Sequence, residues 1–244
     1  MSSLRDYVNV YEFTTTLPGT GEEVKFKPVT TKEIKKLLVY ENETDPTIIE
    51  TIMDELIESS VLTEDFSLSN TYLQDRYFLL LELRKKSKGS KYKTNYVCDN
   101  CGSQNLVVID LDALTIKHRT DDGEVVKISN GLTLHLKNIT RGKQKEAYST
   151  VSKGDMTDLQ YLSELGVLTF AIGIGKVETP DGIIEDSSLE DRKYLLENIP
   201  LEDYEKVREW YNENDFGPKL SKVIKCINCD KEETIDLPIG DFFF

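Results

Sequence analysis

The four cysteines of the chain form two short pairs, and this is the residue pattern best able to do chemistry. One pair is Cys98 and Cys101, the other is Cys226 and Cys229, and two residues separate the members of each pair. Four thiolates in two such pairs can close one tetrahedral zinc site. The sequence therefore predicts one structural zinc ion held by all four cysteines, with no position left open for a substrate.

Two other uses of paired cysteines stay open at this point. A thioredoxin-like redox pair places a cysteine at a helix N-terminus within a βαβ unit, and neither pair has that setting. An iron–sulfur cluster could also take four thiolates. The 124 residues between Cys101 and Cys226 do not argue against a joint site, because the entropy of loop closure rises slowly with length.

The residues around both pairs predict matching hairpins. Residues 92–97 and 105–111 flank the first pair, and residues 222–225 and 233–237 flank the second. All four segments are rich in strand-forming side chains and are separated by turn residues. We expect two knuckles of one zinc ribbon, formed from residues 91–114 and 221–244.

Residues 1–90 predict a hairpin followed by three helices. The alternating segment 24–29 is expected to pair with the stretch before Leu17-Pro18-Gly19, and helices are expected to begin after Thr30, after Asp45 and near 67–69. Thr30 with Glu33 has the spacing of a capping box, and Asp45-Pro46 is a typical helix start. The helical spacing of apolar residues predicts a core and no ligand site.

Residues 115–220 are expected to form an insertion between the two halves of the ribbon. Asn130-Gly131 predicts a hairpin with a two-residue turn, and helices are expected over 141–153 and 157–175, after Ser187 and from Pro200. The predicted fold class is α+β. It is helix-rich, with small β-hairpins and a four-cysteine zinc ribbon made of two distant knuckles.

The charge of the chain excludes some functions. Its 244 residues carry 44 acidic and 30 basic side chains, a net charge of −14 and a pI near 4.7. Phosphate contacts depend on lysine and arginine, so a general nucleic-acid binder is disfavoured and protein partners fit better. A zinc-ribbon nucleic-acid binder stays open as the alternative function, because the chain has one local basic stretch. This stretch consists of Arg84, Lys85, Lys86, Lys88, Lys91 and Lys93.

No apolar run approaches the roughly 20 residues of a membrane span, and the first residues have no apolar signal core. We therefore expect a protein of the reducing cytosol, where paired cysteines favour a metal over a disulfide. His118 and His135 are the only histidines, and their spacing does not match a ligand pair. The sequence has no Gly-x-Ser-x-Gly and no His-Glu-x-x-His motif, so an enzyme remains only a residual alternative.

The aromatic residues near the C-terminus are candidate partner contacts. Phe242, Phe243 and Phe244 end the chain, and Trp210 lies on the helix expected after Pro200. Exposed aromatic clusters mark interaction sites. The alternative for the three phenylalanines is burial in the core of the protein itself.

Three segments carry a resemblance to a known family. They are Leu17-Pro18-Gly19-Thr20-Gly21 with Val24 to Pro28, residues 79–89, and Tyr96 to Gly102 with the first cysteine pair. Over most of its length the chain resembles the baseplate hub and hub-assembly proteins of T-even-type tailed phages. The motif is a zinc-knuckle frame in a helical context and has no catalytic signature.

The resemblance implies a non-enzymatic role in building the hub of a contractile tail's baseplate. The protein would be a hub component, or an assembly factor or chaperone for the hub or the tape-measure protein. It would work by protein–protein docking on the zinc-stabilised scaffold, in the host cytoplasm during assembly, and a place in the baseplate of the finished virion tail stays open. Its partners would be other phage tail and baseplate proteins, without membrane contact.

Overall fold

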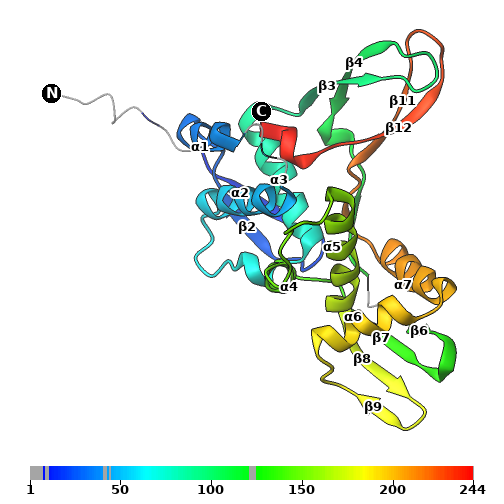
Figure 1. The fold of residues 1–244 in the computed structure, drawn as a ribbon. Helices are drawn as coiled ribbons and strands as arrows, with labels where there is room; N and C mark the ends of the chain where they lie inside the picture. Colours follow the sequence, from blue (N-terminus) through cyan, green and yellow to red (C-terminus); the bar gives the residue numbers. More distant parts are fainter. Residues whose placement is uncertain (1–7, 9–10, 41–42, 44, 121–124, 244) are drawn as a thin grey trace. The chain divides into compact units, whose positions relative to one another are not determined.

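The computed structural model describes the chain apart from residues 1–7, 9–10, 41–42, 44, 121–124 and 244 (Figure 1). The chain forms two compact units. The first comprises residues 1–66, 77–117 and 217–244, and the second comprises residues 67–76 and 118–216. The division into 1–90, two ribbon halves and 115–220 stays a prediction, whereas the α+β class with small antiparallel sheets is confirmed.

The first unit begins with an antiparallel hairpin. Strand β1 (Phe13–Thr16) pairs with β2 (Glu23–Phe26), and Phe13 lies opposite Phe26. The hairpin is joined to the end of the second helix, because the Lys27 N–H donates to the Ser60 carbonyl over 2.9 Å. The predicted N-terminal hairpin is therefore confirmed for the strands that the structure describes.

Two helices of the first unit begin where their caps predict, whereas the third begins later than predicted. Helix α1 (Thr31–Leu37) follows Thr30, whose N–H donates to the Glu33 carboxylate over 2.6 Å. Helix α2 (Pro46–Ser60) follows Asp45, whose carboxylate accepts from the Thr47 N–H over 2.8 Å. The start predicted near 67–69 is wrong for helix α3 (Leu73–Lys88), because residues Leu68–Asn70 form a separate 3-10 helix that ends before it. Helix α3 belongs to this unit from Tyr77 onward.

Two further hairpins of the first unit carry the cysteine pairs. Strands β3 (Lys91–Val97) and β4 (Gln104–Asp110) pair along seven residues, and β11 (Ser221–Lys225) pairs with β12 (Glu232–Asp236) along five. The short strands β5 (Ile116–Lys117) and β10 (Gly217–Pro218) pair with each other. The chain therefore leaves this unit and returns to it at neighbouring positions.

The core of the first unit is aliphatic and aromatic. Many of its fully buried side chains come from the first hairpin, helices α2 and α3 and the C-terminal segment. They include Phe26, Ile57, Leu80, Leu81, Leu83, Phe242 and Phe243. Full burial of one such side chain contributes about 1.5–3 kcal/mol relative to exposure.

The second unit contains a four-stranded antiparallel sheet in the order β6-β7-β8-β9. Its strands are β6 (Val126–Lys127), β7 (Thr133–Leu136), β8 (Ile174–Thr179) and β9 (Gly182–Ile184). The hairpin predicted at Asn130-Gly131 is present, but its connection is longer than two residues. Lys127 lies opposite Thr133, and the Ile128 N–H donates to the Leu132 carbonyl, which leaves Ser129, Asn130 and Gly131 in the turn.

Four helices complete the second unit: α4 (Arg141–Tyr148), α5 (Asp158–Gly173), α6 (Leu189–Asn198) and α7 (Leu201–Glu213). Helix α4 ends five residues before the predicted 153. The cap of α6 is Ser188 and not Ser187, because the Ser188 hydroxyl accepts from the Asp191 N–H over 3.0 Å. The spacing of a cap residue and an acidic residue fits both serines, so the sequence pattern alone could not choose between them.

The core of the second unit lies between its sheet and its helices. Leu134, Leu136, Ile174 and Val177 come from the central strands, and Ala171, Leu196, Val207 and Trp210 come from the helices. In the described part of the chain, no helix has the length and apolar character that crossing a membrane requires.

Candidate metal centre

The four cysteines come together inside the first unit, at the ends of the two ribbon hairpins. Their sulfur atoms all lie within 4.8 Å of one another. Sγ of Cys98 is 3.7 Å from Sγ of Cys229, and Sγ of Cys101 is 3.7 Å from Sγ of Cys226. Each short contact therefore joins one pair to the other, and the site needs both hairpins.

These distances fit a tetrahedral metal and not a disulfide. A Zn–S bond of about 2.3 Å gives S···S edges of about 3.8 Å in a regular tetrahedron. A disulfide needs about 2.05 Å between its sulfur atoms. The donor set, the spacing and the sulfur–sulfur distances fit one metal ion bound by four thiolates.

The backbone of the two knuckles follows the same pattern. The Cys98 N–H donates to the Ser103 carbonyl and the Gly102 N–H to the Cys98 carbonyl, over 3.0 and 2.8 Å. In the second knuckle, the Cys226 N–H donates to the Lys231 carbonyl and the Asp230 N–H to the Cys226 carbonyl, over 2.9 and 3.0 Å. The first cysteine of each pair is buried, and the second is more exposed.

Both knuckles also need a left-handed residue directly after their second cysteine. Gly102 has a φ of 67° and Asp230 has a φ of 59°. Glycine adopts this conformation without steric cost, and aspartate is among the few other residues that tolerate it. Asp230 also pairs with Lys225 over 3.0 Å.

Asparagine side chains connect the knuckles around the sulfur atoms. The Asn100 amide donates to Sγ of Cys229 over 3.4 Å, and the Asn228 amide lies 3.7 Å from Sγ of Cys101. Each asparagine directly precedes the second cysteine of its own pair and serves a sulfur of the opposite pair. Sequence reasoning did not single out these residues, although the repeated Cys-x-Asn-Cys pattern was a readable signal.

Ser103 and Asn105 fix the site from strand β4 and the turn before it. The Ser103 hydroxyl is 3.1 Å from Sγ of Cys101 and 3.3 Å from Sγ of Cys226. Asn105 is 1% exposed, donates to the Ser103 carbonyl over 2.9 Å and accepts from the Ile227 N–H over 3.0 Å. Such supporting contacts orient metal ligands and tune their affinity.

The four thiols have different proton affinities. Burial raises the pKa of Cys98 to about 11, whereas the hydroxyl of Ser103 lowers the pKa of Cys226 to about 5 and also lowers that of Cys101. Four neighbouring thiolates repel one another, so ionising all of them requires a cation among them. A divalent metal would supply this charge, and its binding would release protons.

A charged pair lies beside the first knuckle. The Glu233 carboxylate accepts from the Lys231 ammonium over 2.9 Å and from the Asp99 N–H over 3.2 Å. These contacts, led by the one from Lys231, hold the pKa of Glu233 below its usual value. Lys231 and Glu233 come from the second hairpin and Asp99 from the first, so this contact also joins the two.

The basic stretch between Arg84 and Lys93 is largely engaged within the first unit. Arg84 is buried and donates to the Gly89 carbonyl over 2.7 Å, and Lys88 donates to the Phe243 carbonyl over 2.9 Å. Lys85 pairs with Glu82 and Asp112, Lys91 pairs with Asp110, and Lys86 lies over the ring of Phe13. These contacts give most of the cations a structural role.

Three of the four predicted aromatic contacts lie in the core of a unit. Phe242 and Phe243 are each 1% exposed, and the Phe242 ring lies 5.3 Å from that of Tyr92. Trp210 is 5% exposed and packs in the core of the second unit. The burial of Phe242 and Phe243 corresponds to the alternative in which the protein's own core covers them. Phe244 lies outside the described residues. Contact of a partner with Trp210 or with any of the three phenylalanines stays a prediction.

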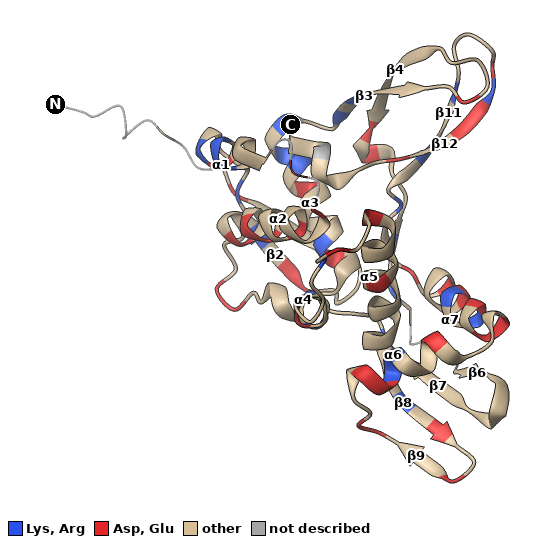
Figure 2. Ribbon diagram, in the orientation of Figure 1, with Lys and Arg blue, Asp and Glu red and all other residues tan. Residues whose placement is uncertain are grey.

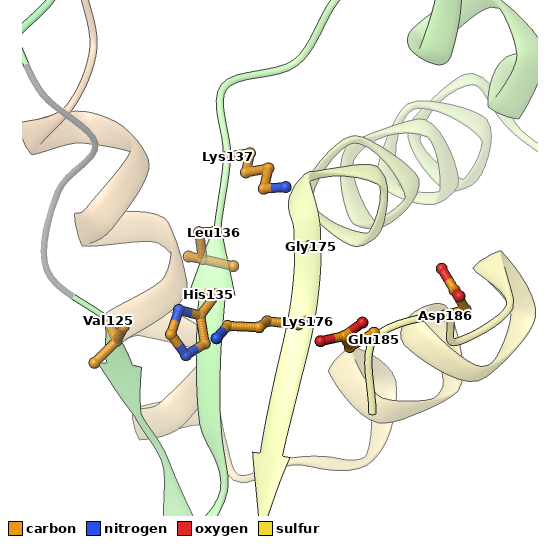
Figure 3. A pocket seen from close by; sticks show the side chains of 8 residues that line it. All are labelled: Val125, His135, Leu136, Lys137, Gly175, Lys176, Glu185 and Asp186. Carbon is orange, nitrogen blue, oxygen red and sulfur yellow. The ribbon is translucent and has the colours of Figure 1, made fainter. Parts of the chain in front are cut away.

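A pocket of 440 Å³ lies beside strands β7 and β8 in the second unit (Figure 3). His135, Lys137 and Lys176 line it together with Glu185 and Asp186. His135 Nε2 is 2.7 Å from a carboxylate oxygen of Glu178, and Lys176 reaches toward His135 in Figure 3. Among the described residues, the lining contains no serine, threonine or cysteine.

The fold and the cysteine cluster define an α+β protein in which two distant hairpins meet at a centre of metal-binding geometry. The chain belongs to the family described as T4 bacteriophage base plate protein, whose family model matches residues 8–244. This membership confirms the resemblance to phage baseplate proteins. Neither a curated protein nor a solved structure matches the chain.

Proposed function

We propose that the chain is a non-enzymatic structural or morphogenesis protein of the baseplate hub, acting by protein–protein docking on a zinc-stabilised scaffold. The family membership supports the baseplate assignment. The cysteine geometry supports one structural zinc ion bound by Cys98, Cys101, Cys226 and Cys229. Its partners are other phage tail proteins, with the hub and tape-measure proteins as the first candidates.

The observation that carries this proposal is the crossing of contacts at the cysteine cluster. Each short S···S contact joins sulfur atoms from opposite hairpins, so one ion would hold segments that are 124 residues apart in the chain. Holding a surface in its bound conformation lowers the entropy lost when a partner docks. A closed four-thiolate site adds stability and no reactivity.

The first experiment measures metal content and partner binding together. The chain is co-expressed with hub and tape-measure proteins, purified, and analysed for zinc by mass spectrometry. We expect about one zinc per chain and co-purification of a tail protein. A Cys101→Ser, Cys229→Ser variant should lose both the zinc and thermal stability, while Ser152→Ala should retain them.

Two results would contradict the proposal. A chain that keeps its full melting temperature after zinc has been removed would show that the ion does not support the fold. Absence of every tail protein from the purified complex would contradict the docking role. Mass spectrometry of finished virions then separates a hub component, which is retained, from an assembly factor, which is not.

A further inference from the structure

An apolar groove opens on the surface of the second unit, between hairpin β8–β9, helix α6 and the turn at Ser129–Gly131. Its volume is 370 Å³. Its apolar lining includes Leu132, Val177, Ile184, Leu195 and Ile199. Leu132, Leu195 and Ile199 also pack against the core of this unit, so the groove is the open side of that core.

Two apolar side chains of the groove remain accessible. Ile184 is 47% exposed and Tyr194 is 67% exposed. Polar side chains such as Asn130, Thr179 and Asn198 also line it. An exposed apolar patch with a polar rim is typical of an interaction site.

The chain segment that supplies most of the groove is strongly acidic, although the charged residues in the lining itself are one acidic and one basic, Asp191 and Arg192. Residues 178–206 contain ten acidic and three basic side chains, a net charge of −7. Figure 2 shows Asp and Glu spread over hairpin β8–β9 and helices α6 and α7. A segment of net negative charge favours a positively charged partner and raises its rate of association.

The three basic residues of this segment are already engaged. Arg192 donates to the carbonyls of Ser187 and Ile174 over 2.6 and 2.9 Å. Lys193 pairs with Glu164 over 2.6 Å, and Lys206 pairs with Asp203 over 2.7 Å. These cations are therefore poorly placed to hold an anionic ligand.

We propose that this groove binds a basic, apolar segment of another polypeptide, whose large apolar side chains enter the groove while its lysines or arginines face the surrounding carboxylates. The volume is near the lower end of the range for ligand pockets, which suits a few side chains. This inference deepens the proposed docking function and rests on it. It names the chemistry of one partner and the place where that partner binds.

Neighbouring isoleucines on strand β9 provide a matched pair of variants. Ile184 lines the groove, whereas Ile183 is 57% exposed and does not line it. Successive side chains of a strand point to opposite faces. Ile184→Ser and Ile183→Ser thus make the same chemical change at similar exposure, on and off the proposed surface.

The test measures fluorescence anisotropy of a labelled peptide titrated with the full chain. The probe carries a Leu-Phe-Leu core with two lysines on each side; one control peptide replaces the lysines by glutamates, and another replaces the core by serines. We expect saturable binding of the first peptide alone, weakened at least about tenfold by Ile184→Ser and less than about twofold by Ile183→Ser. Raising the salt concentration should weaken it further.

Several outcomes would overturn the proposal. They are absence of binding, equal binding of the glutamate peptide, and equal effects of the two isoleucine variants. Self-association of the chain that Ile184→Ser abolishes would also overturn it, because the occupant would then be a second copy. Failure of this peptide test leaves zinc content and co-purification with tail proteins unaffected, so it can be told apart from failure of the proposed function.

Discussion

The side-chain amide of Asn100 donates to Sγ of Cys229 over 3.4 Å, so a residue of the first cysteine pair supports a sulfur of the second. Asn228 occupies the equivalent position for Sγ of Cys101, over 3.7 Å. The two hairpins thus contribute both ligands and supporting donors to each other's half of the site. This reciprocity makes the site sensitive to single changes in either hairpin.

We expect Asn100→Ala and Asn228→Ala each to weaken zinc binding by about tenfold, because loss of a supporting hydrogen bond to a ligand typically costs 10- to 100-fold in metal affinity. Competition with a coloured chelator measures the change. Asn95→Ala on β3 is the control, since Asn95 is exposed and pairs with Leu106 outside the turn that carries Cys98 and Cys101. Equal affinity of the Asn100 variant and the control would show that the amide has no role at the metal.

Asn105→Ala should lower the free energy of unfolding by about 1–3 kcal/mol, the usual cost of leaving a buried polar group without its partner. The change removes the acceptor of the Ile227 N–H, a contact that joins the two hairpins. Urea unfolding measures the effect. Asn95→Ala again serves as the control, and a loss no larger than in that variant would contradict the bridging role.

Phe242→Ala should lower the free energy of unfolding by about 3–5 kcal/mol, because it leaves a cavity in the core of the first unit. Tyr11→Ala, at a side chain that is 67% exposed, should have little effect. Thermal unfolding distinguishes the two. Unchanged melting combined with lost binding of tail proteins would instead favour docking of Phe242 on a partner.

Stability should depend on the ionisation of Asp203 at low pH. The Lys206 ammonium, together with the Ser129 N–H, lowers the pKa of Asp203 from 3.8 to about 2 in the folded chain. A lowered carboxyl pKa stabilises the fold above the unfolded-state pKa, and this contribution disappears as pH falls from about 4 to about 2. Asp203→Asn should therefore be destabilising at pH 7, and its deficit should shrink toward pH 2.

Thermal or urea unfolding across this pH range checks the prediction. Asp181→Asn, in the exposed turn of hairpin β8–β9, is the matched control and should show no such deficit. A deficit of Asp203→Asn that is constant from pH 7 to pH 2 would be incompatible with the ionic contact.

Gly102 and Asp230 occupy equivalent left-handed positions, which allows a paired test. A Cβ atom added at Gly102 would meet no other atom within 4 Å. Gly102→Ala should therefore lower the free energy of unfolding only by the cost of a left-handed backbone at alanine, about 1–2 kcal/mol. Asp230→Gly places glycine at the equivalent left-handed position, where it has no steric cost, and should be neutral or slightly stabilising. Chemical unfolding of both variants tests the assignment, which a neutral Gly102→Ala would refute.

The sequence predicted those features that depend on local chemistry. Asp45-Pro46 and Thr30 with Glu33 specified helix starts because caps act within one turn. The cysteine pairs specified two hairpins because their flanks alternate as strands do. Ser187 and Ser188 could not be told apart in this way, since both have an acidic residue three positions later.

Features that depend on contacts between distant parts of the chain were harder to predict from the sequence. Both cysteine pairs repeat a Cys-x-Asn-Cys pattern, but the contacts of Asn100 and Asn228 with the opposite pair arise only when the two hairpins pack together. The burial of Phe242 against Tyr92 likewise depends on segments 150 residues apart in the chain. Of the candidate site, the clustering of the four cysteines could be predicted from the sequence, whereas the contacts of the side chains around them could not.

The pairing of β5 with β10 leaves residues 118–216, most of the second unit, between the two cysteine pairs in the chain, and this has a consequence for synthesis. A ribosome that has just made Cys101 must add another 124 residues before it reaches Cys226. At about 5–20 residues per second, that takes roughly 6–25 s. A chain cut short in this interval cannot assemble the four-sulfur cluster, so the cluster distinguishes finished chains from truncated ones.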